Sequence, residues 1–280
     1  MRNGVLLTLG LLIATALHGA EREDTITREF TLAASGGARR VEIDNVFGPV
    51  TVRAGSSASE VKVEIRRRAE ARHADDLETA FRDVTLAVRE GPGGLELVQD
   101  GPFRCSERRH HGFGRTCDWD QEFELSWEWM VTVPVDVELE VRSVNGGAVE
   151  VSGVHGRIEA ANVNGAVRLR DLVGAVEART VNGGIEVAFA RPPAAASSFE
   201  SVNGEIELGL PRESSADIGL ETMNGEMWSD FELVAVPQPA RSAGGRRRFE
   251  LGRDTVVRIG RGGVRLDCQT LNGDIVVRAL

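Results

Sequence analysis

Apolar and polar residues alternate in short runs along most of this 280-residue chain. Val149-Glu150-Val151 and Ile185-Glu186-Val187 are typical, and the longest run extends from Phe123 to Val141. A period of two places one set of side chains in a core and the other in water, which is the pattern of a β-strand. Pro134 interrupts the longest run and indicates a break between two strands, or an edge position. The chain is therefore predicted to be all-β.

Two tryptophans share the apolar side of the longest run. Trp127 and Trp129 follow the same period as the valines after them, so both are predicted to lie in the core. Stacking of their rings on a sugar is the alternative. Trp228 falls outside the regular pattern and is a candidate for surface exposure.

A second regularity is the recurrence of the dipeptide Asn-Gly. The first three pairs are 19 and 18 residues apart, and the next two intervals are both 21 residues. Gly156 and Gly174 fall between the early pairs, so glycine returns every 9 or 10 residues from position 146 to position 183. A fixed spacing of this kind indicates a repeat architecture. The six pairs are Asn145-Gly146, Asn164-Gly165, Asn182-Gly183, Asn203-Gly204, Asn224-Gly225 and Asn272-Gly273.

Two architectures can use such a repeat. Asn-Gly between alternating runs often closes a β-hairpin, which would give an antiparallel sandwich. A half-period of about nine residues favours instead a β-solenoid, whose successive coils stack about 4.8 Å apart. In that arrangement the Asn-Gly pairs line up at a corner, where both residue types tolerate a positive φ. We predict the β-solenoid.

One segment departs from the strand pattern. Between Ala74 and Val84, the residues Leu77, Ala80 and Phe81 recur on one helical face, with acidic residues on the other. This pattern predicts a single short helix that covers an end or flank of the solenoid, as terminal units of repeat proteins must.

The N-terminus resembles a signal peptide. Arg2 precedes an apolar stretch from Val5 to Ala14, which is too short to span a bilayer comfortably, and the small residues Gly19 and Ala20 follow. Cleavage after Ala20 would export the protein to the periplasm or cell surface with no membrane span, whereas a retained anchor is the alternative. The predicted organisation is a signal peptide (1–20), a β-rich N-terminal cap region with the helix (21–99), a Cys-containing insertion loop (100–121) and the repeat array (122–280).

The insertion loop contains Cys105 and Cys117, with His110 and His111 between them. In an exported chain two nearby cysteines favour a disulfide. A metal site and free thiols are the alternatives, although this spacing matches no familiar zinc module. Cys268 lies in a strand-like run and is predicted to be a small buried hydrophobe.

Charge and residue types limit the possible functions. The chain has 33 basic and 43 acidic residues, a net charge of −10, which argues against nucleic acid as a partner. Its histidines give no spacing that supports a Ser-His-Asp triad. Glutamates recur on the polar side of the strands, and such repetition indicates solvation more than one site. No catalytic, cofactor-binding or metal-binding residue is therefore predicted.

At its C-terminal half the chain resembles a known family. The matching segments are Val131-Thr132-Val133-Pro134, Leu139 to Gly146, Leu210 to Gly225 and Leu266 to Ile275. Together they resemble the bacterial β-strand-repeat family of adhesin-like proteins labelled domain of unknown function 4097 (DUF4097), over residues 41–280. The resemblance implies a β-solenoid, an envelope or surface setting, and no established enzymatic residues. The insertion between Cys105 and Cys117 departs from the family pattern.

Two classes of function follow. The first is a non-catalytic envelope protein for adhesin-like binding or scaffolding, which would contact an envelope or surface protein or polysaccharide through the solenoid surface and could self-associate. The second is a β-helix enzyme acting on polysaccharides, a lyase or hydrolase, which would need clustered carboxylates or a basic residue in a groove.

Overall fold

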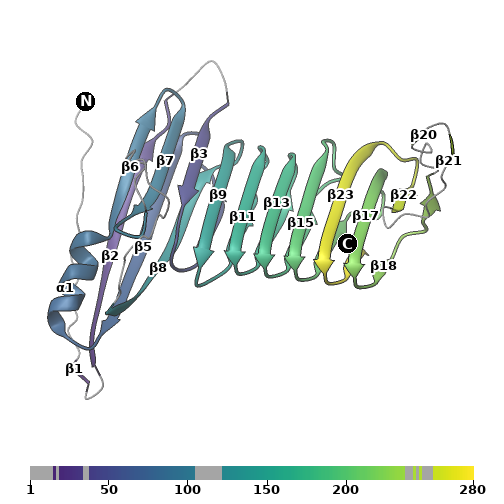
Figure 1. The fold of residues 1–280 in the computed structure, drawn as a ribbon. Helices are drawn as coiled ribbons and strands as arrows, with labels where there is room; N and C mark the ends of the chain where they lie inside the picture. Colours follow the sequence, from purple (N-terminus) through teal and green to yellow (C-terminus); the bar gives the residue numbers. More distant parts are fainter. Residues whose placement is uncertain are drawn as a thin grey trace.

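The computed structural model describes residues 15–16, 19–33, 38–104, 122–236, 242–243, 246–247 and 255–280. Over these ranges the chain forms two large sheets and one helix (Figure 1). Sheet A runs, in spatial order, through β1 (Thr15–Ala16), β2 (Gly19–Thr31), β5 (Glu60–Ala71), β8 (Phe123–Pro134), β4 (Val50–Gly55), β10 (Val149–Ser152), β12 (Val167–Leu172), β14 (Ile185–Phe189), β16 (Ile206–Leu210), β24 (Ile275–Ala279) and β18 (Met227–Ser229).

Sheet B faces sheet A across the core. Its spatial order is β19 (Val234–Ala235), β22 (Thr255–Ile259), β17 (Ala216–Asn224), β23 (Val264–Asn272), β15 (Ser197–Asn203), β13 (Val176–Asn182), β11 (Ile158–Asn164), β9 (Glu138–Asn145), β3 (Arg40–Asp44), β7 (Gly94–Asp100) and β6 (Thr85–Gly91). A separate pair joins β20 (Ser242–Ala243) to β21 (Arg246–Arg247).

The middle of the molecule is a stack of two-stranded coils. Each coil has one strand in sheet B, an Asn-Gly turn, and one strand in sheet A, as in β11–β12 and β13–β14, of which β11 and β13 are labelled in Figure 1. Neighbouring coils pair in parallel and in register, Ile158 with Val176 in sheet B and Val167 with Ile185 in sheet A. Parallel pairing confirms the predicted all-β solenoid and excludes the antiparallel sandwich for these strands.

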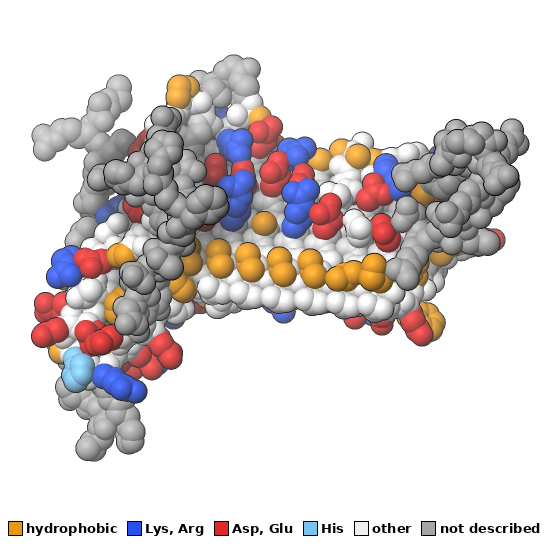
Figure 2. Space-filling view, in the orientation of Figure 1, with side chains coloured by type: hydrophobic (Ala, Val, Ile, Leu, Met, Phe, Trp, Pro, Cys, Tyr) orange, Lys and Arg blue, Asp and Glu red, His pale blue; other side chains and the backbone are white. Residues whose placement is uncertain are grey.

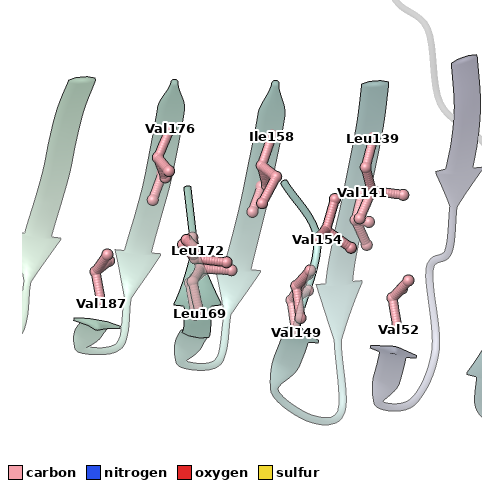
Figure 3. Close-up of a cluster of buried hydrophobic side chains, with 14 of the residues drawn as sticks. Val52, Leu139, Val141, Val149, Val154, Ile158, Leu169, Leu172, Val176 and Val187 are labelled. Carbon is pink, nitrogen blue, oxygen red and sulfur yellow. The ribbon is translucent and has the colours of Figure 1, made fainter. Parts of the chain in front are cut away.

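The core fills the space between the two sheets. Leu139, Ile158 and Val176 point inward from sheet B toward Val149 and Leu169 of sheet A, and all five are buried (Figure 3). The inward residues repeat at the same position in every coil because a period of two keeps one face of each strand in the core. Burial of each such side chain contributes about 1.5–3 kcal/mol.

The order of coils in space differs from their order in sequence at both ends. The coil β3–β4 lies between the pair β7–β8 and the coil β9–β10, although its residues precede both in the chain. Likewise, β23–β24 lies between β15–β16 and β17–β18, although its residues come last. The first and last coils are therefore each held between two others.

The helix α1 (Ala74–Asp83) covers a flank of sheet A. Sheet A extends beyond the coils through antiparallel pairing of β8, β5 and β2. The buried face of the helix, formed by Leu77, Ala80 and Phe81, packs against Ala69 and Phe123 of this extension. The predicted helix and its covering role are confirmed.

Further sequence predictions can be compared with this fold. Pro134 ends β8 before β9 begins at Glu138, which confirms the predicted strand break. Trp127 and Trp129 are fully buried, and Trp129 Nε1 donates to Asn45 Oδ1 at 3.0 Å, so the core interpretation holds and the sugar-stacking alternative is wrong. Cys268 is buried and Trp228 is 58% exposed, both as predicted.

Other predictions fall on residues that the structure does not describe. Cys105 and Cys117 lie in the range 105–121, so the disulfide stays a prediction. Residues 1–14, which hold the apolar part of the predicted signal peptide, are also outside the described ranges. Among the described residues, no helix is long and apolar enough to cross a membrane.

Candidate functional site

The six Asn-Gly pairs stack at one corner of the solenoid, where sheet B turns into sheet A. Five of the six asparagine side chains donate from Nδ2 to the Oδ1 of the asparagine on the adjacent coil, at distances of 2.7–3.0 Å, and Asn145 at the end of the row only accepts. The ladder runs in spatial order through Asn145, Asn164, Asn182, Asn203, Asn272 and Asn224. Asn272 lies between Asn203 and Asn224 because the last coil, β23–β24, lies between β15–β16 and β17–β18.

A second row of polar side chains lies just inside this corner. The residue two positions before each asparagine is buried and bonds to a glycine carbonyl on the adjacent coil. Thr180 Oγ1 donates to Gly165 O at 2.9 Å, and Ser201 Oγ donates to Gly183 O at 3.0 Å. Asn162, Thr270 and Thr222 make the equivalent bonds. These bonds give the glycine carbonyls a partner on the adjacent coil and so hold neighbouring coils together at the corner.

Close backbone approach explains the glycines of the corner. A Cβ on Gly183 would lie 2.3 Å from Gly165 O, and one on Gly204 would lie 2.0 Å from Gly183 O. Gly165, Gly183 and Gly225 are not among the glycines with positive φ, and Asp171 is the only non-glycine residue of the described chain with positive φ. The expected reason for Asn-Gly, tolerance of a positive φ, is therefore wrong at these positions.

The N-terminal coil modifies the corner. Phe47 pairs with Asn145 and so occupies the ladder position, while Asn45 is buried at the inner position. Asn45 Nδ2 donates to Gly48 O at 2.7 Å, a glycine carbonyl of its own coil, whereas the inner residues of the other coils donate to a glycine carbonyl of the adjacent coil. The segment 45–48 is thus a copy of the repeat in which the asparagine has moved inward and an aromatic residue ends the ladder.

Beside the asparagine ladder lies a continuous row of exposed apolar side chains, which we call the apolar stripe. Figure 2 shows it as an orange row along the face of sheet B, next to the white row of the corner. Its members directly precede five of the six asparagines, one in each coil from β11 to β17, whereas Val144, which precedes Asn145, is less exposed. They are Val163 (38% exposed), Val181 (40%), Val202 (39%), Leu271 (39%) and Met223 (52%).

A shallow groove of about 540 Å³ runs along the inner side of the apolar stripe. It crosses five coils, from β11 to β17, and its other wall is formed by Ala161, Arg179, Glu200, Gln269 and Glu221. Five strands about 4.8 Å apart give the groove a length of roughly 19 Å. One wall is therefore aliphatic and the other polar, over a length that suits an extended segment or a ridge of a partner.

Beyond this wall the charged side chains of sheet B neutralise one another. Arg157 contacts Glu159 at 2.8 Å and Glu177 at 3.3 Å, and Arg179 contacts Glu177 at 2.7 Å and Glu200 at 3.2 Å. Sheet A carries a similar row, in which Arg168 and Arg170 alternate with Glu150 and Glu186. Exposed pairs of this kind each contribute little, but together they cancel charge along both faces.

Two neighbouring carboxylates, Glu42 and Glu140, lie on adjacent strands β3 and β9 of sheet B. Glu140 is buried between the guanidinium groups of Arg40 and Arg142. Burial, followed by the charge of Glu140, raises the pKa of Glu42 above its usual range. A polysaccharide-acting enzyme would need a carboxylate that can reach the substrate, whereas Glu140 is buried and paired with two arginines. Within the described ranges, no group of three or more His, Cys, Asp or Glu side chains could hold a metal ion.

The structure thus gathers the predicted Asn-Gly residues into one corner, while the apolar stripe beside them was missed. Its signal is present in the sequence, since Val163, Val181, Val202, Met223 and Leu271 each precede an asparagine. Alternation alone assigns these positions to the solvent side of the strand. A repeated apolar residue on a solvent-facing position was the signal of an exposed apolar surface.

Comparisons with known proteins are distant. No protein-family model matches the chain, so the resemblance to the DUF4097 family stays a prediction, and no curated protein matches it. A crystal structure of a candidate cell adhesion protein from Clostridium sporogenes is similar, with 10% identity, a TM-score of 0.43, and coverage of 91% of this chain and 100% of that one. A candidate adhesin from Bacteroides fragilis has 10% identity and a TM-score of 0.37, over 91% of this chain and 97% of that one.

Proposed function

We propose that this chain is a non-catalytic, exported protein of the cell envelope that binds a partner through the apolar stripe and its groove, as an adhesin or scaffold does. The observation that carries the proposal is the unbroken row of five aliphatic side chains, each more than a third exposed, along a groove of about 540 Å³. Contiguous exposed apolar surface of this kind marks interaction sites in soluble proteins. The signal-peptide pattern of residues 1–20 supports export.

The apolar stripe can supply part of the free energy of binding. Full burial of a Val, Leu or Met side chain is worth about 1.5–3 kcal/mol. About 40% of each stripe residue is still exposed, so covering all five would yield about 3–6 kcal/mol before polar contacts are added. The polar wall, with Arg179, Glu200 and Gln269, would then supply orientation through hydrogen bonds, as polar rims do in protein interfaces.

The partner is an envelope or surface protein or a polysaccharide, and the aliphatic character of the stripe favours apolar side chains of a protein. A photo-crosslinking amino acid at Val181 in the stripe, used on native envelopes, tests this directly. A matched probe at Val88 on β6, a valine 37% exposed at the far end of sheet B, controls for capture by any exposed valine. We expect one saturable product from position 181 and none from position 88.

The double variant Val181→Asp and Val202→Asp then tests affinity for the captured partner. It places two charges within the stripe, and we expect binding to weaken more than about 100-fold, since each desolvated charge opposes burial of the surface. Val88→Asp is the control and should bind normally. Binding that survives the double variant but is lost when residues 100–121 are deleted would move the site to the insertion loop and overturn the proposal. Turnover of an envelope polysaccharide abolished by one Glu→Gln change would instead establish an enzyme.

A further inference from the structure

The two sheets end differently at the end of the molecule where β17 and β18 lie. Sheet B continues beyond β17 through the antiparallel strands β22 and β19, which cover its edge. Sheet A stops at β18, which pairs with β24 and has no neighbour on its other side among the described strands. The three residues of β18 therefore form an open edge.

Hydrogen bonds show which backbone groups point to this edge. Ile275 N donates to Glu226 O, and Asp230 N donates to Val277 O, both at 2.9 Å. In a parallel ladder the backbone N–H and C=O groups of alternate residues point to the same neighbouring strand. The backbone groups of Trp228 therefore point to β24. Met227 and Ser229 consequently direct their N–H and C=O groups away from the sheet. The edge thus offers two donors and two acceptors to another strand.

Side chains at this edge are apolar and exposed. Met227 is 36% exposed and Trp228 58%, and nearby Leu233 and Val234 are 39% and 59% exposed. Proteins normally protect an edge strand with charged residues. At the opposite end of sheet A, β2 is covered only at Gly19 and Ala20 by the two-residue β1, and it follows this rule with Glu, Asp and Arg at six of its thirteen positions. In β18 the three positions are Met, Trp and Ser, so the strand itself carries no charged residue.

Carboxylates surround the open edge. Glu226, Asp230 and Glu232 are exposed, and Asp230 Oδ2 accepts a hydrogen bond from Ala279 N at 3.1 Å. The ion pairs of the described chain include none of these three carboxylates, whereas most acidic residues on the coil faces are paired with arginine. A second copy docking by the same end would bring the same negative charges together. Charge complementarity therefore selects a basic occupant.

We propose that the open edge of β18 binds an extended basic segment of a partner protein by strand addition. The segment pairs its backbone with Met227 and Ser229, packs an apolar side chain on Trp228, and places Lys or Arg near Glu226 and Glu232. Main-chain hydrogen bonds supply affinity in this mode of recognition, and the flanking side chains supply specificity. The site is separate from the apolar stripe, because Trp228 lies on sheet A.

The probe for the test is a fluorescein-labelled peptide, Lys-Val-Lys-Val-Lys-Val-Lys, and the protein is the full chain. We expect saturable binding by fluorescence anisotropy at low salt. Hydrogen exchange measured by NMR should show the amide protons of Met227 and Ser229 exchanging fast in the free protein and at least tenfold slower with peptide. A peptide of the same sequence with N-methylated backbone amides should not bind.

Variants separate the contributions of charge and packing. Glu226→Gln with Glu232→Gln should weaken binding about 3- to 10-fold at low salt, whereas Glu60→Gln with Glu64→Gln on β5 removes the same charge elsewhere and should not. Trp228→Ala should weaken binding by a similar factor without unfolding the protein, because the side chain is mostly exposed. Val181→Asp with Val202→Asp should leave peptide binding unchanged, which distinguishes this site from the proposed binding groove.

Three results would overturn the proposal. The first is an absence of saturable binding. The second is binding that the N-methylated peptide reproduces or that leaves the amides of Met227 and Ser229 unprotected. The third is protection of these two amides in the protein alone that rises with protein concentration, since it would identify a second copy as the occupant.

Discussion

Replacing Gly183 by alanine should destabilise the solenoid far more than replacing its neighbour Gly184. A Cβ on Gly183 would lie 2.3 Å from Gly165 O and 2.5 Å from Gly165 C, both backbone atoms of the adjacent coil. A Cβ on Gly184 would meet only Glu205 O, at 3.2 Å. The two substitutions are chemically identical and adjacent in sequence, so the comparison isolates the close approach of the coils.

The magnitude follows from the contacts at the corner. Non-bonded heavy atoms pack best at about 3.5–4.0 Å, so Gly183→Ala must separate the coils locally by about 1 Å. That movement would break the bonds from Asn182 Nδ2 to Asn164 Oδ1 and from Thr180 Oγ1 to Gly165 O, both 2.9 Å. Each bond contributes about 0.5–1.5 kcal/mol, and forced overpacking costs about 1–3 kcal/mol. We expect a total loss of about 4 kcal/mol in the free energy of unfolding.

Gly184→Ala should change this free energy by less than about 1 kcal/mol, because its mild contact is offset by about 0.4–1 kcal/mol of reduced unfolded-state entropy. Urea and thermal unfolding followed by circular dichroism measure both variants. At roughly 2–4 °C per kcal/mol, the midpoint of Gly183→Ala should fall by about 8–16 °C. Equal midpoints for the two variants would refute close stacking as the reason for glycine at this corner.

Four further predictions concern stability and reactivity. Asn182→Ala removes two ladder bonds, of 2.9 and 3.0 Å, and should cost about 1–2 kcal/mol in urea unfolding; a change below about 0.3 kcal/mol would show that the ladder contributes little. Burial raises the pKa of the Cys268 thiol far above its usual range, so iodoacetamide should label it only in denaturant, as mapped by mass spectrometry; fast labelling of the native protein would contradict its burial. Asp24→Ala leaves Arg67, whose side chain is 12% exposed, without its carboxylate and should lower the free energy of unfolding by about 3–5 kcal/mol. Glu29→Ala in the exposed pair with Lys62 should lower it by at most about 1 kcal/mol. Similar thermal midpoints for the two variants would refute the distinction. Hydrogen bonds from Arg258 to Asp217, at 2.7 and 2.9 Å, lower the pKa of this carboxyl below its ordinary value of 3.8. The stabilisation that this ion pair gives is therefore present above that value and is lost as the pH falls through the lower folded-state pKa. Asp217→Asn should flatten the fall in unfolding midpoint below about pH 4, and an unchanged pH profile would contradict the assignment.

Much of the coil architecture could be predicted because it is local. Alternation in Val149-Glu150-Val151 and its counterparts specifies a strand and the face that it buries. The even spacing of Asn-Gly specifies that successive strands stack in one register. Trp127 and Trp129 were assigned to the core because they share the period of the valines, and both are buried.

The order of the coils could not be read in the same way. Thr222-Met223-Asn224-Gly225 and Thr270-Leu271-Asn272-Gly273 carry equivalent inner, stripe, ladder and stacking residues. Either segment could stack on Ser201 and Asn203 by its local contacts, so the pattern does not say which does. That choice depends on long-range packing, such as the pairing of β22 with β17. The open edge of β18 was missed for the same reason, since it exists only because β24 occupies the inner position.

The displaced position of the last coil has a consequence for how the chain acquires its structure. β15–β16 and β17–β18 are synthesised before Val264–Ala279, yet in the finished molecule they are two ladder spacings apart, about 9.6 Å. Because their turn sequences are equivalent, they can pair directly while the later residues are missing. If these two coils pair early, they must separate again before β23–β24 can insert between them. Contacts between such distant segments slow folding, so we expect a populated off-register intermediate whose lifetime sets the rate of the final step.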